Sequence, residues 1–297
     1  MEAVITTKLI HSWLRKYNRG EVTFSPELIQ EYTNNVQERI GKERNKKFTL
    51  RMSNLGRPVC QLQNDKLGTP RISTNEYQRM YTFMAGDMGE LWLIMVMKAA
   101  GVAVDDYNVP VELLIGGEKI KGTADIIIDG ILWDIKTMSS KSYQKYINFG
   151  GFKSLEEDDP FGYVEQGFAY AEGLGLPFGG WIILNKNTGD IAVSEVPINY
   201  DKYKSESLAR SAKTIQIVMD TVTADDVQRQ FSPIEETFNK KPTGNMILPV
   251  TCGWCEYTES CWPNAEYRKS AVSSAKTPPW FYYTEVNYEK DSTPTFK

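Results

Sequence analysis

The sequence has little histidine and no long apolar run. His11 is the only histidine in 297 residues, so catalysis by a histidine base and a histidine-rich metal site are both excluded. No apolar stretch approaches the roughly 18 to 20 residues that a membrane span needs. Residues 1–20 lack the uninterrupted apolar core of a secretory signal. We therefore expect a cytoplasmic protein with no membrane partner.

Cysteine is also scarce, and basic charge is not in excess. In a cytoplasmic protein, the four cysteines are more often buried thiols or metal ligands than disulfides. The net charge is -4, but residues 1–60 hold eleven basic and six acidic residues, a net of +5. Much of this excess comes from Arg39, Lys42, Arg44, Lys46, Lys47, Arg51 and Arg57. These residues could follow a nucleic-acid backbone, or they could simply be a solvated helix end.

The hydrophobic pattern predicts helices in the first hundred residues. Ser25-Pro26-Glu27 reads as a helix start, with an N-cap, a proline at the first position and an early acid. A second helix is predicted from Ser73 or Thr74 to Gly101, where glycine can adopt the left-handed conformation that ends a helix. Its later turns are almost entirely apolar, which indicates a core helix.

From residue 109 onward, short β-rich runs alternate with turns and helices. Strands are predicted at 109–115, 119–129 and 131–138, and a second pair at 179–185 and 191–196. A helix capped by Asp159-Pro160 should end near Gly175, and another should cover 200–222. Residues 276–297 lack periodicity and are read as an extended tail. This order predicts an α/β fold, a mixed β-sheet core with helices on both faces.

Two acids and a lysine lie on neighbouring predicted strands. Asp134 and Lys136 flank Ile135, so both face the same side of their strand. A tight turn at Asp129-Gly130 would bring Asp125 beside Asp134. Such carboxylates can hold Mg²⁺ or Mn²⁺ for phosphodiester hydrolysis, with the lysine orienting or deprotonating the attacking water. Taken alone, however, Asp134 and Lys136 are more readily explained as an ordinary ion pair.

The spacing of these residues resembles a known nuclease superfamily. Gly122-x-x-Asp125, placed nine residues before Asp134-Ile135-Lys136, is similar to motifs II and III of PD-(D/E)XK nucleases. In the RecB-like branch a helical acid ahead of these strands binds metal, and Glu90 stands at that position, without the histidine that often precedes it. The resemblance implies a restriction-endonuclease-like fold in which Lys136 assists the attacking water. The implied ligands of Mg²⁺ or Mn²⁺ are Glu90, Asp125, Asp134 and the backbone carbonyl of Ile135.

Gln166 and Tyr170 form a pattern that resembles the Q-x-x-x-Y motif of the same branch. Four residues make about one helical turn, so the two side chains face the same way. The resemblance implies that both help to position DNA, whereas the plain alternative is an ordinary amphipathic helix. Aromatic side chains at Tyr143, Tyr146 or Phe149 could stack on unpaired bases.

The cysteine spacing predicts one metal centre. Cys252, Cys255 and Cys261 form C-x2-C-x5-C, which lets three thiolates reach one site, and Cys60 is the remaining candidate for a fourth ligand. This layout resembles the iron-sulfur nucleases AddB and the CRISPR-associated RecB-like exonucleases. It implies a structural [4Fe-4S] cluster. Zinc is the main alternative, and unligated thiols are the third.

These patterns together predict four regions. They are a helical N-terminal region with the basic strip at 1–60, a nuclease core at 61–225, an iron-sulfur segment at 226–270 and an extended tail at 271–297. The resemblance implies a metal-dependent DNA exonuclease acting in recombination, repair or phage and CRISPR DNA processing. The alternatives are a non-catalytic DNA-binding or assembly module on the same fold, and an unrelated zinc-binding protein. A homo-oligomer or a recombination-protein partner is left open.

Overall fold

The chain forms two compact units, each built from two separate segments. The structure is a computed structural model that describes residues 2–41, 47–72, 76–147, 151–157, 159, 161–197 and 200–289. The first unit contains Met1–Arg57 and Asn75–Ile217, and the second contains Pro58–Thr74 and Val218–Lys297. Among the described residues, no helix combines the length and the apolar character required to cross a bilayer.

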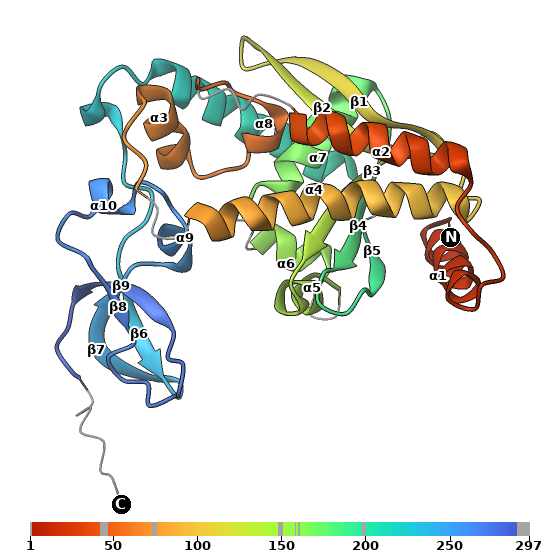
Figure 1. Ribbon diagram of the computed structural model, residues 1–297. Helices are drawn as coiled ribbons and strands as arrows, with labels where there is room; N and C mark the ends of the chain where they lie inside the picture. Colours follow the sequence, from red (N-terminus) through yellow and green to blue (C-terminus); the bar gives the residue numbers. More distant parts are fainter. Residues whose placement is uncertain are drawn as a thin grey trace, which may run out of the picture. The chain divides into compact units, whose positions relative to one another are not determined.

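A five-stranded mixed sheet organises the first unit (Figure 1). Its strands are β1 (Val104–Ile115), β2 (Glu118–Ile128), β3 (Ile131–Met138), β4 (Phe178–Asn185) and β5 (Ile191–Glu195), in that order across the sheet. The β3–β4 pair is parallel and the other three pairs are antiparallel. The turn between β2 and β3 uses Asp129 and Gly130, both at positive φ, as the sequence predicted.

The helices largely follow the sequence pattern. Those of the first unit are α1 (Glu2–Asn18), α2 (Pro26–Gly41), α4 (Glu76–Ala99), α5 (Ser140–Ile147), α6 (Phe152–Glu157), α7 (Tyr163–Leu174) and α8 (Tyr200–Asp220), whose last residues belong to the second unit. A short 3-10 helix, η1 (Met52–Asn54), precedes the second-unit segment. The Ser25 hydroxyl accepts a hydrogen bond from the Leu28 backbone N–H, which confirms the predicted N-cap. The predicted start of α4 at Ser73 or Thr74 lies outside the described residues.

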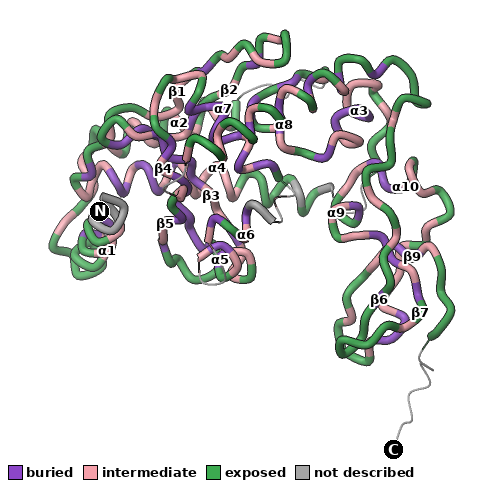
Figure 2. The backbone as a smooth tube through the Cα atoms, turned by 180° about the vertical axis from the view of Figure 1, so that it is seen from behind, coloured by how far each residue is buried: buried purple, intermediate pink, exposed green. Residues whose placement is uncertain are grey.

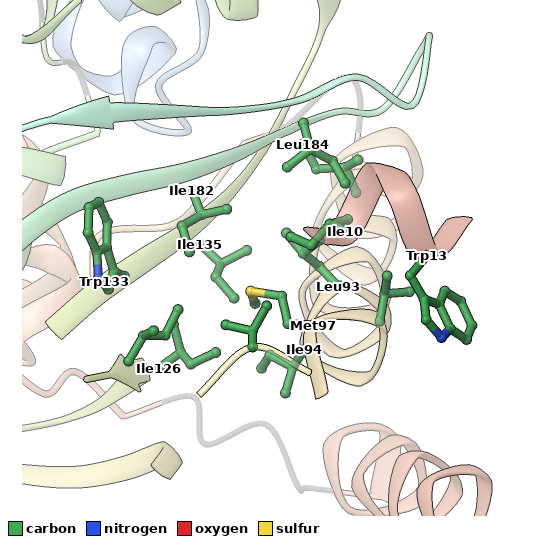
Figure 3. Packing of buried hydrophobic residues seen from close by; sticks show 14 residues of the cluster. Ile10, Trp13, Leu93, Ile94, Met97, Ile126, Trp133, Ile135, Ile182 and Leu184 are labelled. Carbon is green, nitrogen blue, oxygen red and sulfur yellow. The ribbon is translucent and has the colours of Figure 1, made fainter. Parts of the chain in front are cut away.

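Helices cover both faces of the five-stranded sheet. Figure 3 shows the core on one face, where α1 and α4 pack against the strands. Its labelled residues are Ile10, Trp13, Leu93, Ile94, Met97, Ile126, Trp133, Ile135, Ile182 and Leu184. On the other face, Phe168 of α7 meets Phe178 of β4 edge to face, with ring centroids 5.6 Å apart. The predicted mixed sheet with helices on both faces is therefore confirmed.

The second unit contains a smaller sheet that the sequence pattern did not predict. Its strands are β6 (Ile234–Phe238), β7 (Lys241–Ile247), β8 (Glu266–Lys269) and β9 (Trp280–Glu285), in the order β6-β7-β9-β8. Its helices are α3 (Val59–Leu67), α9 (Val250–Gly253) and α10 (Thr258–Cys261), with the 3-10 helix η2 (Ala224–Asp226). The predicted tail is thus extended but partly paired, because β9 buries Tyr282 and Tyr283 between strands.

Candidate active site and cysteine pocket

The acids and the lysine of β2 and β3 meet on one face of the sheet. Ile126 and Ile135 belong to the core beneath α4, so strand alternation places Asp125, Asp134 and Lys136 on the opposite face. The Asp125 carboxylate accepts a 2.7 Å hydrogen bond from the Ile135 backbone N–H, which fixes the two strands side by side. The predicted convergence of these three side chains therefore occurs.

Asp134 is almost completely buried and only partly satisfied. Its side chain is 2% exposed, and its Oδ1 accepts hydrogen bonds from Lys136 Nζ at 2.8 Å and Gln166 Nε2 at 3.2 Å. Its Oδ2 lies 2.7 Å from the same Nζ but has no hydrogen bond. A buried carboxylate of this kind could also serve as a ligand of a divalent cation, which binds carboxylate oxygens.

Glu90 approaches this site because α4 packs unusually close to β3. A Cβ atom at Gly89 would lie only 2.7 Å from Thr137 Cγ2, so the glycine allows the helix to reach the strand. Glu90 follows directly and interacts electrostatically with Asp125 and Lys136. All three predicted acids therefore belong to one electrostatic cluster.

Arg39 of α2 binds Glu90, which the sequence analysis did not predict. Its guanidinium lies 2.9 Å from Glu90 Oε1 and 3.3 Å from Asp87 Oδ1, and it donates a 3.0 Å hydrogen bond to Asn108 Oδ1. The sequence left two interpretations of Arg39 open, a contact with a nucleic-acid backbone and a solvated helix end, but its guanidinium faces the acidic cluster. Of the other strip residues, Lys42, Arg44 and Lys46 lie outside the described residues.

Gln166 and Tyr170 of α7 both face the cluster. Gln166 is buried and donates to Asp134. Tyr170 lies against Gly122 of β2, where an added Cβ atom would be 2.5 Å from the tyrosine Cε1. This contact gives a physical reason for glycine at the first position of Gly122-x-x-Asp125.

Tyr163 is a further site residue that the sequence analysis did not name. Its ring lies 4.9 Å from Lys136 Nζ, so the ammonium sits between the Asp134 carboxylate and an aromatic face. Tyr163 is three residues before Gln166, and this helical spacing was the available signal.

The aromatic residues suggested for base stacking near 143–149 do not fulfil that role. Tyr143 and Tyr146 of α5 are 8% and 4% exposed, because α5 turns its aromatic side chains toward β4 and β5. Phe149 lies outside the described residues. The suggestion for Tyr143 and Tyr146 was therefore wrong, since a base cannot stack on a buried ring.

Burial and neighbouring charges shift the protonation of the cluster. Burial raises the pKa of Glu90 to about 7; the nearby Asp125 charge adds to this increase and Arg39 opposes it. Burial also raises the pKa of Asp134 well above its ordinary value, partly offset by Lys136. Burial lowers the pKa of Lys136, but Asp134 and Asp125 outweigh it and keep the lysine protonated. Lys136 is therefore a fixed cation at neutral pH.

The carboxylates are currently turned toward cationic and backbone donors rather than toward one shared point. Within the described ranges, no three His, Cys, Asp or Glu side chains are arranged closely enough to hold a metal ion. Glu90 is engaged by Arg39, Asp125 by the Ile135 N–H and Asp134 by Lys136. A cation at this site would require these side chains to turn toward one shared point.

The four cysteines line one cavity in the second unit, which we call the cysteine pocket. Its wall also includes Arg229, Phe231 and Trp262. The thiols are free, and Cys252 is buried. Cys60, which is 192 residues before Cys252 in the chain, lines the same cavity as the other three cysteines.

Polar contacts hold the segment of Cys60 against the segment of the other cysteines. The Tyr257 hydroxyl hydrogen-bonds to Asp65, and Arg71 donates to Tyr257 at 3.0 Å. The Ile72 backbone N–H donates to the Glu256 carbonyl at 2.9 Å. These bonds join the segment that carries Cys60 to the segment that carries the other three cysteines.

The thiols are held in their protonated form. Burial raises the pKa of Cys252 to about 12 and that of Cys255 to about 11, and the neighbouring thiols contribute. Burial also raises the pKa of Cys60 and of Cys261, although Arg229 opposes the rise at Cys261. Thiolates, which are the metal-binding form, would therefore need a positive centre to stabilise them.

Comparisons with known proteins found similar folds among solved structures. No model of a protein family matches this chain, and no curated protein matches it. The crystal structure of SSO0001 is 17% identical, with a TM-score of 0.42, and the match covers 78% of this chain and 94% of that one. A protein from Eubacterium rectale named "Putative exonuclease" is also 17% identical, with a TM-score of 0.32, covering 63% of this chain and 74% of that one. Both TM-scores are below 0.5, so the case for a function depends on the chemistry of the site.

Proposed function

We propose that the chain is a DNA nuclease of the PD-(D/E)XK superfamily, in its RecB-like branch, that hydrolyses phosphodiester bonds with Mg²⁺ or Mn²⁺. The observation that carries this proposal is Asp134, a carboxylate with a 2% exposed side chain that pairs with Lys136 through both oxygens and accepts a hydrogen bond from Gln166. Asp125 and Glu90 interact with it electrostatically. Three acids beside a buried lysine suit phosphodiester hydrolysis better than a structural ion pair.

Each residue has a separate role in this proposal. Glu90, Asp125, Asp134 and the Ile135 carbonyl would hold the cation. The cation, when bound, polarises the scissile phosphate and lowers the pKa of the attacking water. Lys136 orients this water and stabilises negative charge, because its raised pKa keeps it from acting as a base. Gln166 keeps Asp134 in place, and Tyr170 helps to position DNA.

The test is cleavage of end-labelled single- and double-stranded DNA with Mg²⁺ or Mn²⁺. We expect cleavage from the ends, with loss of at least about a hundredfold in Asp134→Asn and in Lys136→Met. Lys121→Ala, on the same pair of strands but exposed to solvent, is the matched control and should cleave normally. Cleavage that persists in both site variants would contradict the assignment, provided that circular dichroism shows all proteins folded.

One observation favours the alternative of a non-catalytic DNA-binding or assembly module. The guanidinium of Arg39 already neutralises Glu90, as it would in a site that no longer binds metal. Titration of the protein with Mn²⁺, followed by calorimetry, separates the two functions. Binding that disappears in Asp134→Asn supports the nuclease, whereas DNA binding without any Mn²⁺ binding supports the module.

We also propose that the cysteine pocket holds a [4Fe-4S] cluster with a structural role, and zinc is the alternative. Four thiols lining one cavity with apolar Phe231 and Trp262 support a cluster. Iron, sulfide and zinc are to be measured in anaerobically purified protein. We expect about four irons per chain, lost in Cys60→Ser and Cys255→Ser and retained in Thr251→Ser, which changes the same cavity wall without removing a thiol. One zinc and no sulfide would favour the alternative.

A further inference from the structure

Three polar side chains of α2 lie on one side of that helix. Glu31, Asn35 and Arg39 follow one another at intervals of four residues, about one helical turn each. The Tyr107 hydroxyl donates to Glu31 at 2.6 Å and accepts from Asn35 at 3.2 Å, and Lys98 of α4 also donates to Glu31. None of the 16 residues of α2 is buried, and Figure 2 draws the helix in the colours of half-buried and exposed residues. These polar contacts fix the side of α2 that faces α4 and β1, and with it the position of Arg39.

Arg39 has two partners besides Glu90. Its guanidinium lies 3.3 Å from Asp87 Oδ1 of α4 and donates at 3.0 Å to Asn108 Oδ1 of β1. Asn108 has a φ of 52°, a left-handed conformation that asparagine adopts more readily than most residues with a side chain. An asparagine therefore suits this position both by its backbone and by the acceptor that it offers to Arg39. Glu90 is thus one of three acceptors, and the guanidinium keeps the other two when Glu90 turns to a cation.

The guanidinium lies beside the carboxylates proposed to hold the cation. It contacts Glu90 and interacts electrostatically with Asp125. A phosphate that reaches these carboxylates would therefore lie next to Arg39, whose side chain is 24% exposed and so remains open to a ligand. A guanidinium stays protonated at every working pH, and its parallel N–H donors match two oxygens of a phosphate. The residue is thus suited to bind a phosphate once Glu90 is engaged elsewhere.

We propose that Arg39 binds the phosphate of DNA held at the acidic cluster, an inference that rests on the nuclease function proposed above. In this role Arg39 changes partners. It leaves Glu90 to the cation, stays attached to Asp87 and Asn108, and donates its freed N–H groups to the phosphate. The same donors stabilise the negative charge of the phosphate during hydrolysis. The contact between Arg39 and Glu90 is then the resting state of a substrate-binding residue rather than the mark of an inactive site.

The first measurement counts phosphate contacts without cleavage. Fluorescence anisotropy gives the affinity for labelled DNA at several salt concentrations in Ca²⁺, which carboxylates also bind, with the DNA confirmed intact on a gel. Loss of one phosphate contact lowers the slope of log affinity against log salt by roughly 0.7 on a single strand and 0.9 on a duplex. We expect this decrease in Arg39→Gln and an unchanged slope in Arg39→Lys, which keeps the charge. Arg19→Gln removes the same charge from an exposed ion pair with Glu21 and is the matched control, so it should leave the slope unchanged.

The second measurement is the cleavage rate of end-labelled DNA at saturating Mn²⁺. Arg39→Gln should lower this rate about a hundredfold, because the donors to the phosphate are lost. Arg39→Lys should recover only part of the rate, since one ammonium cannot form the two parallel hydrogen bonds of a guanidinium. If Arg39 did no more than compete with the cation, Arg39→Gln would cleave as fast as the wild type or faster, and that result would overturn the inference.

The two measurements distinguish failure of this inference from failure of the nuclease proposal. A lower slope in Arg39→Gln, with no cleavage by any of the proteins, would support the phosphate contact and count against the nuclease. An unchanged slope would overturn the inference in every case, including a wild type that cleaves DNA and a wild type that binds none. A lower slope with an unchanged cleavage rate would also overturn it, because the contact would then lie away from the acidic cluster.

Discussion

The guanidinium of Arg39 lies 2.9 Å from a carboxylate oxygen of Glu90. The two residues come from different helices, α2 and α4, and both are largely shielded from water. Arg39 therefore supplies, within the protein, the positive charge that the proposed cation would supply at Glu90. A cation and Arg39 should compete for this carboxylate.

Removal of Arg39 should have opposite effects on stability and on metal binding. In EDTA at pH 8, Arg39→Gln should lose about 2 kcal/mol of unfolding free energy, because the Glu90 charge stays partly buried without its partner. The same variant should bind Mn²⁺ more tightly, since the competing cation is gone. Urea denaturation and calorimetry measure the two effects. Arg19→Gln, which breaks an exposed ion pair with Glu21, is the control and should change neither.

The stability of the metal-free protein should fall as pH rises through 7. The pKa of Glu90 is raised by burial to about 7, above its ordinary value. The folded state therefore prefers protonated Glu90. This preference adds to the free energy of unfolding fully below about pH 4.5, and the addition is lost as pH rises through 7. The loss is at most about 3 kcal/mol. Urea denaturation between pH 5 and 8 should show this decline for wild type and a smaller decline for Glu90→Gln; equal declines would refute the assignment.

The contact between Gly122 and Tyr170 should make stability sensitive to a larger residue at position 122. Gly122→Ala places a methyl group 2.5 Å from the tyrosine ring and should cost about 1 to 3 kcal/mol of stability. When Tyr170→Leu has removed the ring, Gly122→Ala should lower stability clearly less than it does in the wild type. Thermal unfolding of the four proteins measures the difference. Gly41→Ala, at a position with open space, should leave stability almost unchanged. If Gly122→Ala costs the same stability with and without Tyr170→Leu, the contact is contradicted.

The thiols of the cysteine pocket should react slowly when no metal is bound. With the pKa of Cys252 near 12 and that of Cys255 near 11, little thiolate is present at pH 8. Alkylation of these two residues in folded, metal-free protein should be at least about a hundredfold slower than in protein unfolded in urea. Mass spectrometry of iodoacetamide-treated protein gives the rates residue by residue. Equal rates in the folded and unfolded protein would show that the pocket is open.

The sequence predicted the parts of the site that depend on short spacing. Strand alternation and the turn at Asp129 and Gly130 were enough to place Asp125, Asp134 and Lys136 together. One helical turn was enough to place Gln166 and Tyr170 on the same side of α7. Local geometry determines these relationships, so no knowledge of the whole fold was needed.

The missed features depend on contacts between distant segments. Arg39 and Glu90 are joined only when α2 packs against α4, and no local pattern encodes that packing. The small sheet of the second unit was missed because its strands are short, and because Lys240, Lys241 and Pro242 interrupt the apolar alternation around β6 and β7. The aromatic run of β9 does not alternate between apolar and polar residues as a half-buried strand does. Its pairing with β7 and β8 could therefore not be inferred.

The order in which the chain is synthesised has a consequence for the second unit. Residues 58–74 belong to this unit, yet the rest of it begins only at residue 218. At about 5 to 20 residues per second, Cys60 waits roughly 10 to 40 seconds for Cys252 to be made. During this interval the strands β1 to β5 are all translated. The first unit thus has its complete sheet sequence before the cysteine pocket can close, and the cluster proposed for this pocket could be assembled only late in the synthesis of the chain.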